Sequence, residues 1–194
     1  MPIRARGFAS IALLALSACS LAPPHAQSPQ YHDFGPPVAA RAQTGASVGL
    51  REVTAPAWLD SGAIHYRLLA DDPTRLRAYA RQRWIAPPAE LLAQNLREQL
   101  PAEGRPRYWL QLRLARFEQD FDGTAQSHAV IEVQALLLDA DGAVRASRNF
   151  RFSAESPPNV DGAIAGLSAL ANQASQAIAA WSVKPLTADA GPPS

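Results

Sequence analysis

The sequence is short of several residue types on which whole classes of protein depend. A single cysteine among 194 residues excludes a disulfide framework and any metal site built from several cysteines. An excess of charge of one sign is also missing. The formal net charge is +1, and without residues 1–18 the chain holds 16 basic against 17 acidic residues. A chain this close to neutral is not a general nucleic-acid binder. Its 47% content of hydrophobic residues excludes wholesale disorder.

The N-terminal apolar run is too short to span a bilayer. Arg4 and Arg6 are followed by the apolar residues 8–16 and then by the small residues Ser17 and Ala18. A bilayer span needs about 20 apolar residues. A charged start, a short apolar stretch and small residues before a cleavage point are typical of a secretory signal peptide. Residues 1–18 are therefore predicted to direct export and then to be removed.

The cleavage point itself resembles the lipobox of bacterial lipoproteins, in the order Leu16-Ser17-Ala18-Cys19. The resemblance implies that Cys19 becomes the first residue, with a diacylglycerol on its sulfur and an acyl chain on its amine. This covalent lipid is the only cofactor-like group expected. Several acyl chains anchor a protein stably to a membrane. Ser20, where an aspartate favours inner-membrane retention, implies transfer to the outer membrane, facing the periplasm. An ordinary signal with a chance cysteine is the alternative.

The mature chain divides into a tether, a domain and a tail. Residues 19–46 are rich in proline, which favours extended, semi-stiff chain, and fully extended they reach roughly 90 Å at most. Within the tether, residues 31–34 could form a short first strand. The folded domain is predicted over 47–186, with Tyr31 as an alternative start, and residues 187–194 as a flexible tail.

The pattern of apolar and polar residues in the domain predicts six strands and two helices. Alternation of apolar and polar residues indicates strands over 47–54, 64–69, 75–84, 107–117, 128–138 and 143–153. Residues 120–123 and 139–142 are predicted turns. The first helix opens at Pro87-Pro88 and buries a stripe of Leu92, Leu96 and Leu100, and the second runs over about 160–181 with Asn159 as its N-cap. We expect an α+β two-layer sandwich, with an antiparallel or mixed β-sheet and two helices on one face.

Residues that could carry a reaction are scattered. Catalysis requires a nucleophile with a base, paired carboxylates or a metal set. The four histidines are isolated, two in the tether (His25 and His32) and two on separate strands (His65 and His128). Residues 139–142 resemble the opening of a calcium loop but lack its later glutamate. The sequence therefore predicts neither an enzyme nor a metal site.

Arginine is concentrated on one predicted strand. If that strand is regular, its alternate residues share a face, with one further arginine on a neighbouring strand. The five candidates are Arg67, Arg75, Arg77, Arg81 and Arg83. Arginine pairs well with phosphate and carboxylate, so this face is a candidate contact surface for anionic lipid headgroups or an acidic partner. The alternative is a solvated outer face, because exposed strand faces are normally charged.

Two tryptophans near these segments are predicted to be structural. Trp58 lies in the connection before the second of these strands. Trp84 is expected to share a buried strand face with Leu76, Ala78 and Ala80.

Three segments together resemble a known family. They are residues 55–60 (Ala-Pro-Ala-Trp-Leu-Asp), residues 64–67 (Ile-His-Tyr-Arg) and residues 83–88 (Arg-Trp-Ile-Ala-Pro-Pro) before a leucine-rich helix. This order resembles the ABC-type transport auxiliary lipoprotein family, although Trp58 stands where tyrosine is usual and Ile85 interrupts the usual Trp-Ala step. The likeness covers nearly all of the mature chain.

The resemblance implies a function. Family members work with ABC transporters that carry mammalian-cell-entry (MCE) domains and move phospholipids or other hydrophobic molecules between the two membranes. The lipoprotein is the non-catalytic, outer-membrane-anchored part, so the expected partners are an MCE-domain protein and, through the lipid, the membrane. An envelope assembly or structural lipoprotein, such as a barrel chaperone or a tether, is the alternative. The cargo is open, and so is whether the chain forms a homo-oligomer.

Overall fold

The computed structural model describes residues 28–36, 48–100 and 105–188, with side chains up to residue 183. The predictions for the signal peptide, for Cys19, for most of the tether and for residues 189–194 lie outside these residues.

One mixed β-sheet forms the frame of the described part of the chain. Its order is β1-β4-β3-β5-β6-β7, and β2 pairs alongside β5. The last three strands form an antiparallel meander, whereas β2 and β3 both pair in parallel with β5, β2 along its first half and β3 along its second. The strands are β1 (Gln30–His32), β2 (Val48–Thr54), β3 (Ala63–Leu68), β4 (Leu76–Trp84), β5 (Tyr108–Phe121), β6 (Ser127–Leu138) and β7 (Val144–Ser156).

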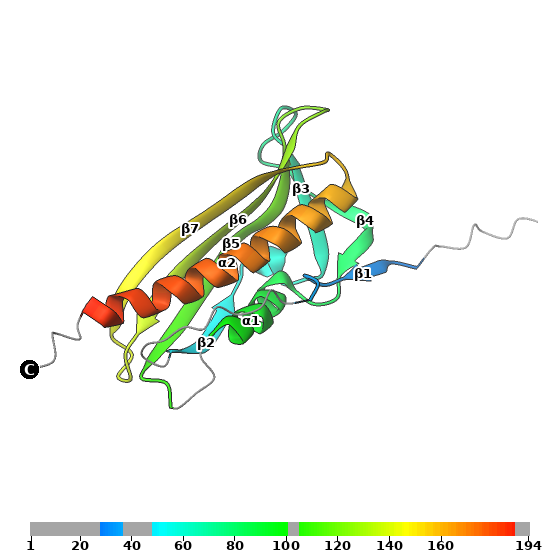
Figure 1. The fold of residues 1–194 in the computed structure, drawn as a ribbon. Coiled ribbons are helices and arrows are strands. Elements are labelled where there is room, and N and C mark those ends of the chain that lie inside the picture. Colours follow the sequence, from blue (N-terminus) through cyan, green and yellow to red (C-terminus); the bar gives the residue numbers. More distant parts are fainter. Residues whose placement is uncertain (1–27, 37–47, 101–104, 189–194) are drawn as a thin grey trace, which may run out of the picture.

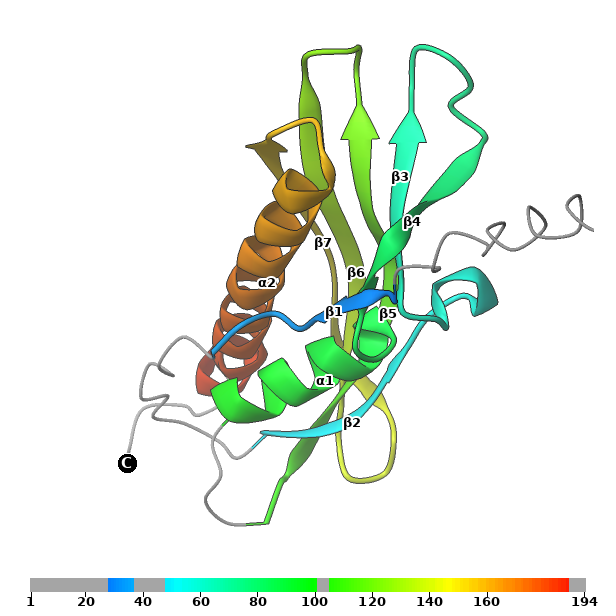
Figure 2. The same cartoon turned by 90° about the vertical axis from the view of Figure 1, so that its right-hand side faces the viewer.

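Two helices pack on the sheet, so the predicted α+β sandwich is confirmed. They are α1 (Pro88–Gln99) and α2 (Val160–Ala188), and a short 3-10 helix, η1 (Ala57–Leu59), joins β2 to β3. Figure 1 shows α2 lying along the meander, and Figure 2 shows α1 beside it on the same side of the sheet. Asn95 of α1 donates a hydrogen bond to Asn172 of α2 at 2.7 Å, which ties the helices together.

The core lies between the helices and the meander, where the predicted alternation places it. Alternate leucines of β5 (Leu110, Leu112 and Leu114) are buried, as are Leu92 and Leu96 of α1. The sheet-facing side of α2 is rich in alanine, which lets the helix approach the strands closely. Its buried residues include Leu167, Ala171, Ala174, Ile178 and Trp181.

The helix signals are also confirmed. Pro88 opens α1 with Glu90 in its first turn. The Asn159 side chain accepts a hydrogen bond from the Gly162 amide at 2.8 Å, as an N-cap does. The helix then continues to Ala188 rather than ending near Trp181.

The turn predicted at residues 120–123 is wrong in its first half. β5 runs on to Phe121, and Asp120 pairs in register with His128 on one side and Arg67 on the other. The turn begins at Asp122, whose amide donates to the Gln126 carbonyl. Aspartates normally favour turns, but here a neighbouring arginine binds the Asp120 carboxylate and holds it in the sheet. The turn at 139–142 is confirmed, with Gly142 at a φ of 85°.

The expected regular alternation along β4 is also wrong. Ala63 pairs with Arg83, but His65 pairs with Ala78, so extra residues of β4 bulge out between these pairs. A bulge reverses which residues face the core. Trp84 is buried as predicted, whereas Ala78 and Ala80 are exposed. Trp58 is 41% exposed and lies with its ring edge-on to His65, so it is not a core residue.

The short strand proposed near Tyr31 exists. β1 pairs in parallel with β4, His32 opposite Trp84. The Phe34 ring then lies in the core, 5.3 Å from the Trp84 ring and 5.5 Å from the Phe117 ring. The packed part of the chain therefore reaches back at least to Gln30.

Within the described ranges, neither helix is both long and apolar enough to cross a membrane.

Candidate contact sites

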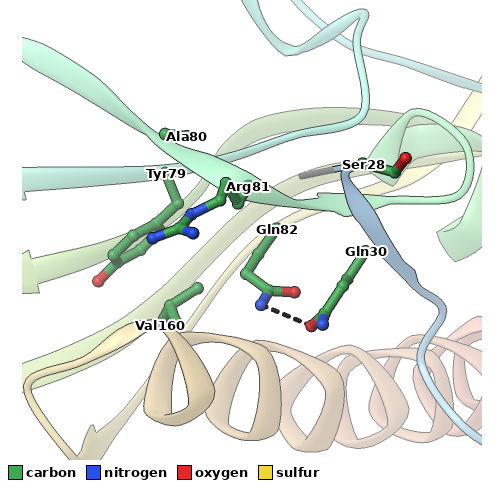
Figure 3. Close-up of a pocket in the computed structure, with 7 residues that line it drawn as sticks. All are labelled: Ser28, Gln30, Tyr79, Ala80, Arg81, Gln82 and Val160. Carbon is green, nitrogen blue, oxygen red and sulfur yellow. Dashed lines mark hydrogen bonds between the residues drawn. The ribbon is translucent and has the colours of Figure 1, made fainter. Parts of the chain in front are cut away.

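A cleft lies where β1, β4 and the start of α2 meet (Figure 3). Its volume is about 710 Å³. The residues that line it are Ser28, Gln30, Tyr79, Ala80, Arg81, Gln82 and Val160. Of the five arginines predicted as contacts, Arg81 is the one that lines this cleft.

The cleft walls are held by side-chain amides. Gln82 donates to the Gln30 side chain at 2.8 Å, and its oxygen lies 2.6 Å from Nε2 of His32, so side-chain hydrogen bonds join β1 to β4. The Tyr79 hydroxyl donates to Gln119 at 2.7 Å. Burial, with a smaller effect from the neighbouring Tyr66, raises the pKa of Tyr79 to about 12, so the phenol stays a neutral donor. Amides, a phenol and a guanidinium suit a polar or anionic group better than an acyl chain.

The five predicted contact arginines do not share one face. Residues opposite each other in a sheet point to the same side, and Tyr66 pairs with Arg77 while Arg67 pairs with Leu76. Arg67 and Arg77 are therefore on opposite faces. Arg83 precedes the buried Trp84 and points away from the core, and Arg75 is exposed just before β4 begins. The prediction that the arginines of this strand share one face assumed a regular strand. The bulge in β4 makes the strand irregular, so the prediction fails.

Arg67 belongs instead to a charge cluster on the sheet face turned away from the helices. Its Nε lies 3.1 Å from the Glu118 carboxylate, which is completely buried and also bound by Arg116. Arg116 also contacts Asp120 at 2.7 Å. We call this set the outer-face cluster, and its members are Arg67, Arg116, Glu118, Asp120, Glu132 and Arg151.

The cluster is electrostatically balanced, with three guanidinium groups and three carboxylates. Burial acts to raise the pKa of Glu118, but hydrogen bonds from Arg67 and Arg116 outweigh it and leave that pKa below its usual range. At Asp120 the effect of burial is larger than the opposing effect of Arg116, so the pKa of that carboxyl is raised. Sequence reasoning missed this cluster, although its signal is visible as charged residues at alternate positions of one strand, 116, 118 and 120.

Truncating Glu118 is expected to destabilise the domain. Glu118→Ala leaves Arg67 and Arg116 without their shared acceptor in a poorly solvated place. Removing one partner of a buried ion pair costs several kcal/mol. Because both arginines are partly exposed and can be hydrated, we expect a loss of about 2–4 kcal/mol of unfolding free energy. Urea unfolding measures it. The matched control is Glu132→Ala at the solvated end of the cluster, expected to cost about 1 kcal/mol or less. Equal losses of unfolding free energy in the two variants would contradict the larger contribution to stability that we assign to Glu118.

His65 gives the domain an expected sensitivity to acid. Its side chain is buried and Nδ1 has no hydrogen-bond partner. Burial lowers the pKa of His65, and Arg67 lowers it further, against an opposing effect of Glu118. A lowered folded-state pKa means stability is present above the unfolded value of about 6.5 and is lost as pH falls through the folded value.

The test is the melting temperature between pH 7.5 and 5.5, above the range where most carboxylates titrate. We expect the wild type to lose stability toward pH 5.5 and His65→Gln to lose less. The control is His128→Gln, since His128 is partly exposed and lies 2.9 Å from Asp122. If only His128→Gln removes the pH dependence of the melting temperature, His128 and not His65 causes the acid sensitivity.

The remaining candidates for chemistry have structural partners. Within the described residues, no three side chains of His, Cys, Asp or Glu gather to hold a metal ion. The Asp139 carboxylate accepts the amides of Asp141 and Ala143, so it closes the hairpin turn.

Comparison with known families assigns this domain. Residues 33–179 match the family described as the ABC-type transport auxiliary lipoprotein component, and the chain belongs to this family. The family consists of lipoproteins that assist transport and not of enzymes. Membership makes the protein a membrane-anchored component of a bacterial envelope.

Two solved structures share the fold. Protein XCC0632 of Xanthomonas campestris is 22% identical with a TM-score of 0.72, over 84% of this chain and 100% of that chain. A second, uncharacterized protein is 16% identical with a TM-score of 0.62, over 80% and 99% of the two chains. A putative lipoprotein of Caulobacter crescentus is 22% identical over 54% of this chain and 84% of its own, with a TM-score of 0.40. Among curated proteins none matches.

Proposed function

We propose that this protein is the outer-membrane-anchored, non-catalytic auxiliary component of an ABC transport system with MCE domains. In this role it helps to move phospholipids or other hydrophobic molecules between the two membranes. The observation that carries the proposal is the family match over residues 33–179. The lipobox at residues 16–19 supports the anchor, and Ser20 supports the outer membrane.

The mechanism is docking at a limited distance from the membrane. The lipid on Cys19 holds the chain in one leaflet. Because β1 is already part of the sheet at Gln30, the free tether is much shorter than residues 19–46. Gln30 is eleven positions along the chain from Cys19, which allows a reach of about 40 Å at most. The domain can therefore meet a transporter component only close to the membrane that holds its lipid.

We assign partner contact to the arginines that the fold directs to solvent or to the cleft. These are Arg75, which is exposed just before β4, and Arg81, which lines the cleft. Arg67 and Arg77 are left out of the contact surface because their side chains are only 19% and 26% exposed and neither lines the cleft. Charged contacts of this kind chiefly raise the association rate and weaken with salt.

The experiment is capture of partners from envelopes. The lipidated full chain is cross-linked in cells, solubilised in mild detergent and purified, and its partners are identified by mass spectrometry. An unrelated outer-membrane lipoprotein with the same tag is the control. We expect enrichment of an MCE-domain protein and its ATPase over that control. Enrichment of barrel-assembly proteins instead would contradict the transport role and favour envelope assembly.

A further inference from the structure

Two large apolar side chains stand exposed beside each other near the point where the described chain begins. Tyr31 is 61% exposed and Ile85 is 66% exposed. The Ile85 amide donates to the His32 carbonyl at 2.8 Å, so the two segments are in direct contact. Both side chains line a hollow of about 390 Å³, whose far wall is Ile164 and Ser168 of α2.

The fold holds these two side chains outward. Their neighbours Trp84 and Phe34 are buried and pack edge to face in the core, which fixes both segments. Gly35, after Phe34, has a φ of 76°, a left-handed conformation that favours glycine and turns the chain away from β1. Exposure of Tyr31 and Ile85 is therefore a property of a firmly packed region.

The chemistry around them is that of a membrane–water boundary. Arg83 is the register partner of Tyr31 across β1 and β4 and points with it away from the Trp84 side. Tyrosine is enriched at membrane interfaces, and arginine can bury its stem while its charge stays in water. Two acidic residues lie close by: Asp33, whose carboxylate accepts the Gly35 amide at 2.9 Å, and Glu98, which lines an adjoining hollow together with Ile85. We call Tyr31, Arg83 and Ile85 the β1-edge patch.

The length of chain outside the structure indicates what covers this patch. Tyr31 is twelve positions along the chain from Cys19, which allows a maximal span of about 42 Å. The lipid thus keeps the β1 edge near the leaflet. A small patch binds weakly alone, but the anchor makes its contact intramolecular.

We propose that the β1-edge patch seats the domain on the phospholipid headgroup layer of the membrane that holds the Cys19 lipid. This inference rests on the lipid anchor of the proposed function. Seating fixes the orientation of the domain, with the β6–β7 hairpin at the end of the sheet far from β1 (Figure 1).

The chain offers a sharp test, because its single cysteine is the lipid site and has no free thiol once lipidated. Ile85→Cys is labelled with a polarity-sensitive fluorophore on the lipidated full chain. The protein is reconstituted in phosphatidylethanolamine–phosphatidylglycerol vesicles with a spin label at headgroup depth. The control is Val144→Cys, which starts β7 and is 57% exposed. Both positions are exposed, so both variants are expected to keep the wild-type melting temperature.

We expect quenching at residue 85 to be several-fold stronger than at residue 144, with a blue-shifted emission at residue 85 only. Equal quenching at the two positions overturns the seating. So does a residue-85 fluorophore that is shielded only after a purified transporter component is added, which would give the patch to a protein partner. Failure to float with the vesicles overturns the anchor and the seating together. The vesicles contain no transporter. The quenching result therefore does not depend on whether the capture experiment finds a transporter partner.

Discussion

Replacing Trp84 with alanine is expected to lower the free energy of unfolding by about 3–5 kcal/mol, as for other buried tryptophans. Trp84 is 1% exposed, and its ring lies 5.3 Å from Phe34 and 5.7 Å from Phe117. These three aromatic rings join β4, β5 and the segment that follows β1. Alanine would leave a cavity at this junction, which the close approach of Gly62 to the Trp84 carbonyl prevents from collapsing easily.

One polar atom limits the size of this effect. The indole Nε1 of Trp84 is buried without a hydrogen-bond partner, which costs free energy in the folded wild type. Removing it offsets part of the lost packing. Trp84→Phe keeps most of the ring and removes the unpaired donor, so we expect it to lose clearly less stability than Trp84→Ala.

The measurement is thermal and urea unfolding of both variants beside Trp58→Ala. Trp84→Ala should lower the melting temperature by about 10–20 °C. Trp58 is 41% exposed, and its loss is expected to cost about 1 kcal/mol or less. A Trp84→Ala variant with an unchanged melting temperature and lost partner binding would make Trp84 a contact residue instead of a core residue.

Elements whose pattern is local were predictable from the sequence. The alternating leucines of β5 and the leucine stripe of α1 bury the residues that the periodicity selects, because burial on one side imposes a period of two on strands and of about 3.6 on helices. Pro88 and Asn159 marked the helix starts for reasons that act within one turn.

Features that depend on distant strands were not predictable. The bulge in β4 is visible only in the pairing of β3 with β4, where Ala63 lies opposite Arg83 and His65 opposite Ala78. A prediction from the alternation of a single segment assumes that the strand has no bulge. The parallel pairing of both β2 and β3 with β5 leaves no trace in the composition of any of these strands.

The contact site shows the same division. The sequence identified Arg67 as a cation on a strand, which is correct, but its partner Glu118 is 51 residues away in the chain. Glutamate is almost never fully buried unless paired, and only the fold shows that this pair exists. The cleft likewise combines Gln30, Arg81 and Val160 from three elements, none of which carries a local signature.

Replacing Cys19 with alanine is expected to abolish membrane anchoring. The thiol is the only atom of the chain that can accept the diacylglycerol at the lipobox, and no second cysteine can substitute for it. Each buried CH₂ of an acyl chain contributes about 0.8 kcal/mol to membrane binding, so loss of two or three chains removes far more than the β1-edge patch can replace. The variant should accumulate as an unprocessed precursor or as a periplasmic protein released from the membrane.

The readouts are membrane fractionation and intact mass. The wild-type mass should correspond to a chain that begins at Cys19 with added acyl groups, and the variant should lack them. Ser20→Asp is the matched control: it keeps the lipid and, by the sorting rule of similar lipoproteins, should shift the protein toward the inner membrane. Because Cys19 and Ser20 precede Gln30, where the first strand of the described sheet begins, we expect both variants to melt like the wild type. If Cys19→Ala still matures and fractionates with the outer membrane, the tether is not held by lipid, and the docking mechanism loses its fixed end.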